Sequence, residues 1–235
     1  MVFRKETELQ GRLESYDLPL EGEFAATFWR REVPVGSCIP DFVYVRFGKV
    51  PSSSLWPSRW TFRHCYVLWL LRKRISLFPE TVASFAYEPL AKIEVVIKDL
   101  LRSGAILQSK SGALNLSKEM IDLRTEVIAV EVKLRRWKEA LAQAQTYQRF
   151  ADRVFVAMDE QNTPSDDETL DRFRKSHVGL CSMSSDTFTW MVLPPVKARP
   201  FSAEREYLVA SAAASPRQTL WVLRKDLNAS NHALT

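Results

Sequence analysis

Two charged side chains interrupt an apolar, β-branched stretch, TEVIAVEVKL, that runs from Thr125 to Leu134. Such a composition predicts a strand. Side chains alternate between the two faces of a strand, so Glu131 and Lys133 project together while Val132 points the other way. A carboxylate and an ammonium on one face can form a structural ion pair, or they can act together on a charged substrate.

Two further features favour the second interpretation. Asp41 follows Pro40 and opens another run of aromatic and β-branched residues, FVYVRF. A predicted helix begins soon after Lys133 and carries Gln143 and Tyr147 four positions apart, on one helical face. An aromatic residue on such a helix can equally be part of the core, which is the alternative for Tyr147.

These residues, in this order, form a recognisable pattern. Pro40-Asp41, Glu131-Val132-Lys133 and the stretch from Gln143 to Tyr147 resemble the PD-(D/E)xK phosphodiesterase superfamily. This superfamily includes restriction endonucleases, Holliday-junction resolvases and the nuclease domains of recombination helicases. The last stretch is similar to the QxxxY element of the recombination-type branch. The resemblance covers residues 20–50 and 120–195 of the chain.

The resemblance implies a metal-dependent DNA nuclease acting in DNA repair, mobile elements or defence. Mg²⁺ or Mn²⁺ would be held by Asp41, Glu131 and the backbone carbonyl of Val132, since hard ions prefer oxygen ligands. Lys133 would orient or help deprotonate the attacking water and stabilise the transition state. The implied catalytic set is Asp41, Glu131, Lys133, Gln143 and Tyr147.

The resemblance also implies an additional acid from the first helix. We expect Glu23 in this role because of its place before the predicted hairpin, with Glu32 and Glu8 as alternatives.

The predicted elements alternate between helices and strands, which indicates an α/β fold. Helices are expected at 6–16, 21–32 and 137–151, a β-hairpin at 33–48 with its turn at Gly36-Ser37, a strand at 153–158 and a second hairpin over 177–193. Residues 161–169 are expected to form a polar loop. The predicted class is a restriction-endonuclease-like core, a mixed central sheet flanked by helices.

An inserted domain explains why Asp41 and Glu131 are 90 positions apart. Residues 51–58, PSSSLWPS, have the composition of a linker. Three predicted helices (59–74, 80–87, 89–104) and two short strands around Lys110 follow, which resembles a winged helix-turn-helix. The expected domains are 1–50 and 121–200 for the nuclease-like core, 51–120 for the winged helix, and 201–235 for a C-terminal helical segment and tail.

Basic residues near these elements are candidates for DNA binding. They are Lys92, Lys98 and Arg102 on the third inserted helix, Lys110 at the tip of the hairpin, and Arg135 and Arg136 beyond the Glu131 strand. Glu94 and Asp99 on the same helix would repel phosphates, so the winged helix can instead be a protein-binding module. The two arginines can also be a solvated helix start.

Composition is compatible with these expectations. The net charge is +5, and no run of apolar residues is long enough for a membrane span. The N-terminus lacks a signal-peptide pattern and the three cysteines are isolated, so we expect a cytoplasmic protein. DNA as its partner is what the resemblance implies. A homodimer or a protein partner bound through the winged helix is possible on this interpretation. The alternatives are a non-catalytic DNA-binding or assembly subunit and a winged-helix transcriptional regulator.

Overall fold

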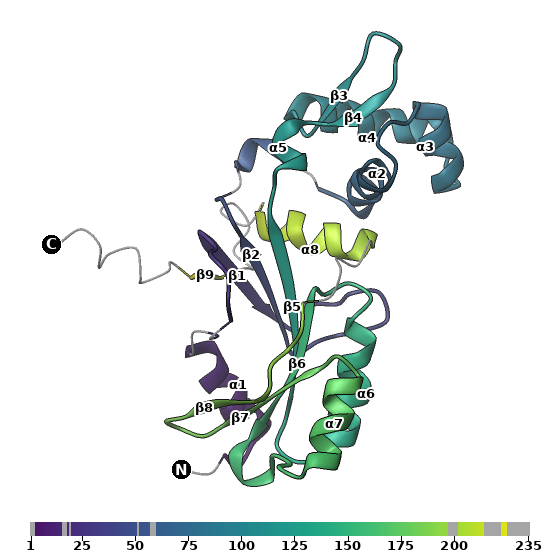
Figure 1. The fold of residues 1–235 in the computed structure, drawn as a ribbon. Helices are drawn as coiled ribbons and strands as arrows, with labels where there is room; N and C mark the ends of the chain where they lie inside the picture. The colour runs from purple at the N-terminus through teal and green to yellow at the C-terminus, as the bar shows by residue number, and fades with distance from the viewer. Residues whose placement is uncertain are drawn as a thin grey trace, which may run out of the picture. The chain divides into compact units, whose positions relative to one another are not determined.

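The computed structural model describes residues 3–15, 18, 20–50, 52–56, 60–196, 202–213 and 222–224 (Figure 1). Its helices are α1 (Glu6–Ser15), α2 (Phe62–Lys73), α3 (Pro79–Ala86), α4 (Leu90–Ser103), α5 (Lys118–Ile121), α6 (Trp137–Tyr147), α7 (Asp167–Lys175) and α8 (Ala203–Ala213). Its strands are β1 (Ala26–Arg31), β2 (Phe42–Phe47), β3 (Ile106–Gln108), β4 (Leu114–Leu116), β5 (Thr125–Lys133), β6 (Arg153–Asp159), β7 (Gly179–Met183), β8 (Phe188–Val192) and β9 (Val222–Arg224). Short 3-10 helices lie at Ser53–Leu55 and Glu160–Asn162.

The chain divides into two compact units. The first unit comprises Met1–Glu23, Arg30–Tyr44 and Glu126–Pro200. The second unit comprises Phe24–Trp29, Val45–Thr125 and Phe201–Thr235. The predicted domain borders at 50/51 and 120/121 both fall within the second unit.

One mixed sheet has the strand order β8-β7-β6-β5-β2-β1-β9. Strands β5, β6 and β7 pair in parallel, whereas β8 runs antiparallel to β7 and β9 antiparallel to β1. The parallel strands are connected through α6 and α7, as two successive βαβ units require. The predicted α/β class, with a mixed sheet flanked by helices, is therefore confirmed.

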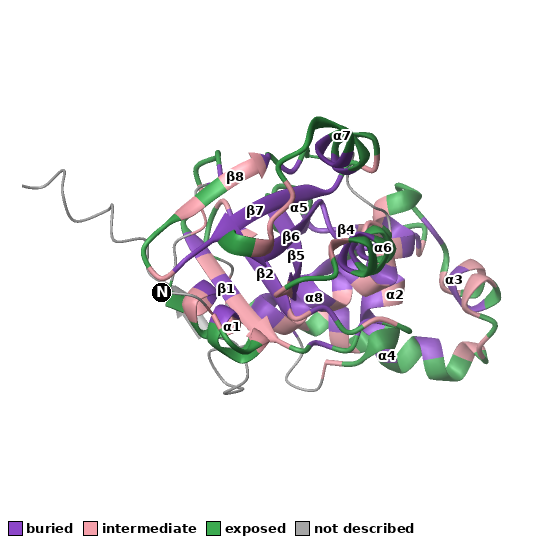
Figure 2. Ribbon diagram, turned by 90° about the horizontal axis from the view of Figure 1, so that it is seen from below, coloured by how far each residue is buried: buried purple, intermediate pink, exposed green. Residues whose placement is uncertain are grey.

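The core of the first unit is built on β5, β6 and β7, whose residues are almost all buried (Figure 2). Continuous apolar strands are typical of a parallel sheet covered by helices. Helix α6 buries Ala140, Leu141, Ala144 and Tyr147 at helical spacing. Helices α6 and α7 lie side by side, and the rings of Trp137 and Phe173 meet with centroids 6.1 Å apart.

Two of the predicted elements are wrong. Residues 21–32 were expected to be helical, but β1 occupies Ala26–Arg31. The apolar pattern there has period two: Ala26 and Phe28 are buried, and Phe28 packs edge-on against Phe47 of β2. The expected loop at 161–169 ends in the start of α7, where the Asp166 side chain accepts a hydrogen bond from the Thr169 N–H and caps the helix.

The predicted turn at Gly36-Ser37 is present, because Val35 and Cys38 exchange both backbone hydrogen bonds around it. Gly36 has φ of 60°, a left-handed conformation that glycine adopts without strain. The first strand of this hairpin is β1, earlier in the chain than the predicted 33–35. The hairpin loop therefore extends from Glu32 to Asp41, with a hydrogen bond from the Glu32 N–H to the Asp41 carbonyl at its base.

The second unit contains the three predicted helices followed by the β3–β4 hairpin. Pro79 starts α3, and Gly104, with φ of 75°, ends α4 in a left-handed C-cap. The segment between α2 and α3 joins the hairpin, since Leu77 and Leu114 exchange both backbone hydrogen bonds. The hairpin is thus held to the α2–α3 segment through Leu114 of β4.

The predicted C-terminal helix is α8, which also belongs to the second unit. Its Glu206 is buried and accepts a 2.8 Å hydrogen bond from Nε of Arg72 on α2. Tyr207 contacts the ring of Phe62 at the start of α2. The predicted tail lies outside the described residues, apart from β9.

Candidate functional site

Strand β5 presents Glu131 and Lys133 on one face, as the alternation predicts. Lys133 Nζ lies 2.8 Å from Glu131 Oε1. Glu131 is 2% exposed, which is unusual for a carboxylate, and the Lys133 side chain is 17% exposed. The pair therefore combines a buried carboxylate with a partly accessible ammonium.

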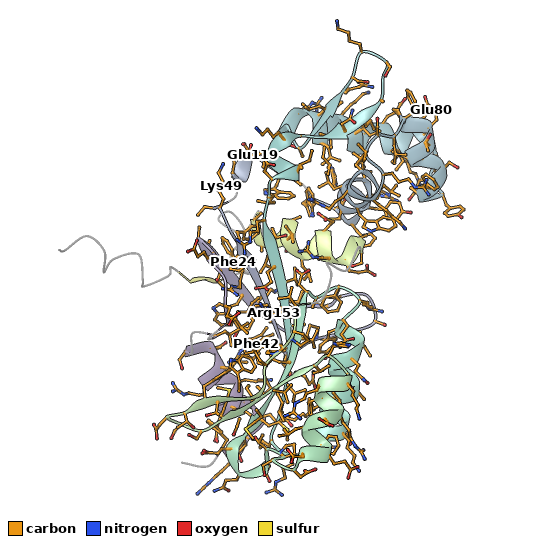
Figure 3. All side chains as sticks on the ribbon, in the orientation of Figure 1. Phe24, Phe42, Lys49, Glu80, Glu119 and Arg153 are labelled. Atoms are coloured by element: carbon orange, nitrogen blue, oxygen red, sulfur yellow. The ribbon has the colours of Figure 1, made fainter. Side chains whose placement is uncertain are left out.

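Asp41 joins this pair from the end of the hairpin loop, directly before β2. Its Oδ2 accepts a 2.7 Å hydrogen bond from the backbone N–H of Val132, between Glu131 and Lys133 in the chain. Its Oδ1 accepts a 3.1 Å hydrogen bond from the Gln10 side chain on α1. The next residue, Phe42 (Figure 3), is fully buried and anchors this end of β2. The structure thus brings Asp41, Glu131 and Lys133 together.

Two carboxylates, Asp41 and Glu131, lie close together in a partly buried position, and this affects the pKa of Asp41. Burial, and next the negative charge of Glu131, raise the pKa of Asp41 from 3.8 to about 6. Hydrogen bonding from Val132 and the charge of Lys133 act in the opposite direction. The surroundings therefore disfavour the ionised form of Asp41, and a cation bound beside it would stabilise that form.

Lys133 is held as the ammonium. Burial would lower its pKa, but the hydrogen bond and charge of Glu131, with smaller contributions from Glu6 and Asp41, raise the pKa above its ordinary value. At neutral pH this side chain is a fixed positive charge beside the two carboxylates.

Tyr147 of α6 completes the hydrogen bonding of Glu131. Its hydroxyl donates to Glu131 Oε2 at 2.6 Å, and its ring contacts Phe150. Burial, followed by this hydrogen bond, raises the tyrosine pKa, so the hydroxyl remains a donor. Tyr147 therefore packs in the core, which was the alternative for this residue, and also contacts the site through its hydroxyl.

Gln143 lies one turn earlier on α6 and is exposed. Its backbone carbonyl accepts a hydrogen bond from Thr146, and its side chain makes no hydrogen bond within the described ranges. Gln143 is therefore not part of the group that surrounds Glu131.

The structure points to an acid that the sequence did not indicate. Glu6 begins α1, and its charge acts on both Asp41 and Lys133. Glu23 and Glu32 are exposed on either side of β1, and Glu8 is exposed with its carboxylate accepting a 2.7 Å hydrogen bond from the Arg4 N–H. The spacing of Glu6 and Gln10, four positions apart on one helical face, is the signal that could have found both.

The donor set suits a hard divalent ion. Mg²⁺ is usually bound by one or two carboxylates together with water and substrate phosphates, and Asp41 and Glu131 supply two. Their repulsion, which raises the pKa of Asp41, is what a bound cation would relieve. Within the described parts of the chain, no group of three or more His, Cys, Asp or Glu side chains is arranged to hold a metal. Further ligands would have to be the Val132 carbonyl, water or substrate.

The candidate DNA-binding residues lie at several places. Lys92, Lys98 and Arg102 are exposed on α4; Lys92 pairs with Glu88 at 3.4 Å and Arg102 with Asp99 at 3.6 Å. Lys110 is exposed at the tip of the β3–β4 hairpin. In the first unit Arg135 and Arg136 are exposed between β5 and α6.

Comparison of the chain with family models, curated proteins and solved structures finds no match. In the described part of the protein, no helix is long and apolar enough to cross a membrane.

Proposed function

We propose that this protein is a metal-dependent nuclease that hydrolyses phosphodiester bonds in DNA. The observation that carries the proposal is the meeting of Asp41, Glu131 and Lys133, from segments 90 positions apart, in one partly buried group. Two carboxylates can hold a divalent ion, and an ammonium can stabilise the negative charge that the scissile phosphate gains as it reacts. This combination suits phosphodiester hydrolysis.

Each residue has a distinct task in this proposal. Asp41 and Glu131 would hold a Mg²⁺ or Mn²⁺ ion, which would supply Lewis acidity toward the phosphate and lower the pKa of a bound water. Gln10 and the Val132 N–H fix the Asp41 carboxylate, and Tyr147 fixes Glu131. Lys133, held protonated, stabilises negative charge on the phosphate. Because its pKa is raised, Lys133 is a poor proton acceptor. Solvent or another base would therefore accept the proton of the attacking water.

A second buried ion pair, between β5 and β6, provides a contrast. Glu126 accepts a 2.8 Å hydrogen bond from Nε of Arg153 (Figure 3), whose Nη1 also donates to the Pro194 carbonyl. Both side chains are at most 9% exposed. That pair connects β5 to β6, and a further buried acid, Asp152, lies beside it and accepts a 2.7 Å hydrogen bond from the Val127 N–H. The Glu131–Lys133 pair differs in accessibility, because the Lys133 side chain is 17% exposed whereas both members of the Glu126–Arg153 pair are buried.

The second unit is proposed to bind DNA as a winged helix-turn-helix. The order of three helices and a hairpin supports this, as does the Leu77–Leu114 bridge, which joins the α2–α3 segment to the hairpin. The alternative function is a non-catalytic DNA-binding or assembly subunit. It is favoured by Glu94 and Asp99 on α4, whose negative charges would repel phosphates if α4 faced DNA.

The test is cleavage of linear, branched and single-stranded DNA in Mg²⁺ or Mn²⁺ and in chelator. Wild type is expected to cleave only with metal, and Asp41→Ala and Lys133→Ala to lose at least about 100-fold. Asp171→Ala, which removes an exposed acid from α7, is the control and should cleave like wild type. Cleavage that survives both site substitutions would contradict the proposal.

A further inference from the structure

A cavity of about 480 Å³ lies in the first unit beside Glu6. Its polar lining comes from three segments: Arg4 and Glu6 at the start of α1, Arg135 and Arg136 after β5, and Gln161 and Asn162 after β6. Apart from Glu6, every charged residue in this lining is an arginine. The cavity is therefore a concave, cationic surface rather than a gap between packed side chains.

We propose that this cavity is a subsite for a phosphate of a nucleic-acid strand, next to the Asp41–Glu131–Lys133 group. The inference rests on the proposed function for the identity of the strand. The phosphate can be a terminal monoester or an internal diester, and both present the same anionic oxygens to the arginines.

The arginines are suited to this task. Guanidinium groups bind phosphate through paired, charge-assisted hydrogen bonds. The side chains of Arg4 and Arg135 form no ion pair with any residue the structure describes, and Arg136 is paired only at the surface, 3.1 Å from Glu139. Forming phosphate contacts would not break a buried interaction.

The neutral part of the lining suits the rest of a nucleotide. Asn162 is held in place by donating to Asp159 at 2.9 Å, and Gln161 is exposed beside it. Phe3 and Leu134 add apolar surface. A cavity of this volume lies in the range of small-ligand sites, so one nucleotide unit can enter.

The position of the cavity relates it to the proposed catalytic group. Leu134 directly follows Lys133 in the chain, and Glu6 both lines the cavity and contributes charge to Asp41 and Lys133. A strand entering the cavity would thus place the neighbouring backbone near the two carboxylates. The acidic Glu6 wall would orient the phosphate toward the arginines.

The test is binding of short single-stranded DNA by the full-length protein in chelator, measured by fluorescence anisotropy, so that no cleavage is needed. The probes are a 5′-phosphorylated oligonucleotide, its 3′-phosphorylated and unphosphorylated counterparts, and a circular strand. The double variant Arg4→Ala/Arg135→Ala is compared with Arg172→Ala/Arg174→Ala, which removes two exposed arginines from α7. Thermal melting verifies that both variants fold.

The cavity variant is expected to bind at least about tenfold more weakly than the α7 control. A loss confined to one phosphorylated end identifies a terminal phosphate, and a loss with every probe identifies an internal one. Equal affinities for the two variants would overturn the inference. If wild type cleaves DNA with metal but the two variants bind equally well, the proposed function is supported and the cavity inference fails. If the cavity variant binds more weakly but wild type does not cleave, the cavity inference is supported and the proposed function fails.

Discussion

The carboxylate of Asp41 accepts a hydrogen bond from the backbone N–H of Val132 at 2.7 Å, across 91 positions of sequence. This contact holds the end of the hairpin loop against the strand that carries Glu131 and Lys133. Because the Asp41 carboxylate is hydrogen-bonded to the backbone between Glu131 and Lys133, it has little freedom to move away from either residue. A main-chain hydrogen bond therefore fixes the position of Asp41 against the strand that carries the other two charges.

The hydrogen bond from Tyr147 to Glu131 should matter for activity as well as for stability. Tyr147→Phe keeps the ring contact with Phe150 but removes the donor, so the free energy of unfolding should fall by about 1–2 kcal/mol. Metal-dependent cleavage should fall about tenfold or more, because Glu131 loses its fixed orientation.

Tyr66→Phe is a matched control, since the Tyr66 hydroxyl donates to the Phe85 carbonyl in the second unit. Urea unfolding and cleavage assays of both variants decide the question. An equal loss of cleavage in both would contradict a specific role for Tyr147.

Asp41 should make stability depend on pH. Because its folded-state pKa of about 6 lies above the ordinary 3.8, the folded protein binds the proton more tightly than the unfolded chain. The stability contributed by protonated Asp41 is full below pH 3.8 and is lost as the pH rises to about 6. Asp41→Asn should therefore be more stable than wild type by about 1–2 kcal/mol at pH 7.5, allowing for partial exposure, and nearly equal at pH 3.5.

Urea unfolding of Asp41→Asn and wild type across this pH range tests the expectation. Adding Mg²⁺ at pH 7.5 should stabilise wild type more than the variant, because only wild type offers both carboxylates. A constant difference between the two proteins at all pH values would contradict the raised pKa.

Removing the Lys133 charge should destabilise the fold as well as abolish cleavage. Lys133→Met retains most of the side-chain volume but leaves the buried Glu131 without its cation, at a cost of about 2–4 kcal/mol near neutral pH. Denaturant unfolding of Lys133→Met and wild type at neutral pH measures this cost, and equal stability of the two proteins would contradict it.

The second unit should contribute phosphate contacts if it binds DNA. Lys98 and Lys110 are exposed and form no ion pair within the described residues, so the double alanine variant should weaken DNA binding and reduce the slope of log K against log salt by about 2. Lys175→Ala, which removes a paired lysine from α7, is the control. Unchanged affinity and slope would favour a protein partner for this unit.

The strands of the site could be predicted because residues close together in the sequence give each of them its strand pattern. The β-branched run from Thr125 to Lys133 and the aromatic run after Asp41 each determine their own conformation, and alternation places Glu131 with Lys133. The wrong helix at 21–32 has a physical reason. Phe24 and Phe28 fit a helical face by their spacing, whereas packing of Phe28 on Phe47 selects the strand.

The parts that sequence could not supply depend on contacts between distant segments. The spacing of Glu6 and Gln10 places them on one helical face, but nothing in the local sequence indicates that this face lies against Asp41. The same is true of Arg4 and the residues that follow β5. Glu23 is closer to Asp41 in sequence than Glu6, yet it is exposed. Sequence proximity was a poor guide because the contact with Asp41 comes from Gln10 of α1, 31 positions away in the chain.

The central claim, that Asp41 and Glu131 hold one divalent ion, is tested most directly by anomalous scattering from a crystal grown with Mn²⁺. We expect one strong peak at about 2 Å from an oxygen of each carboxylate, with Lys133 nearby, and no such peak in Asp41→Asn. A fully occupied peak elsewhere in the protein, with none between these two residues, would contradict the account.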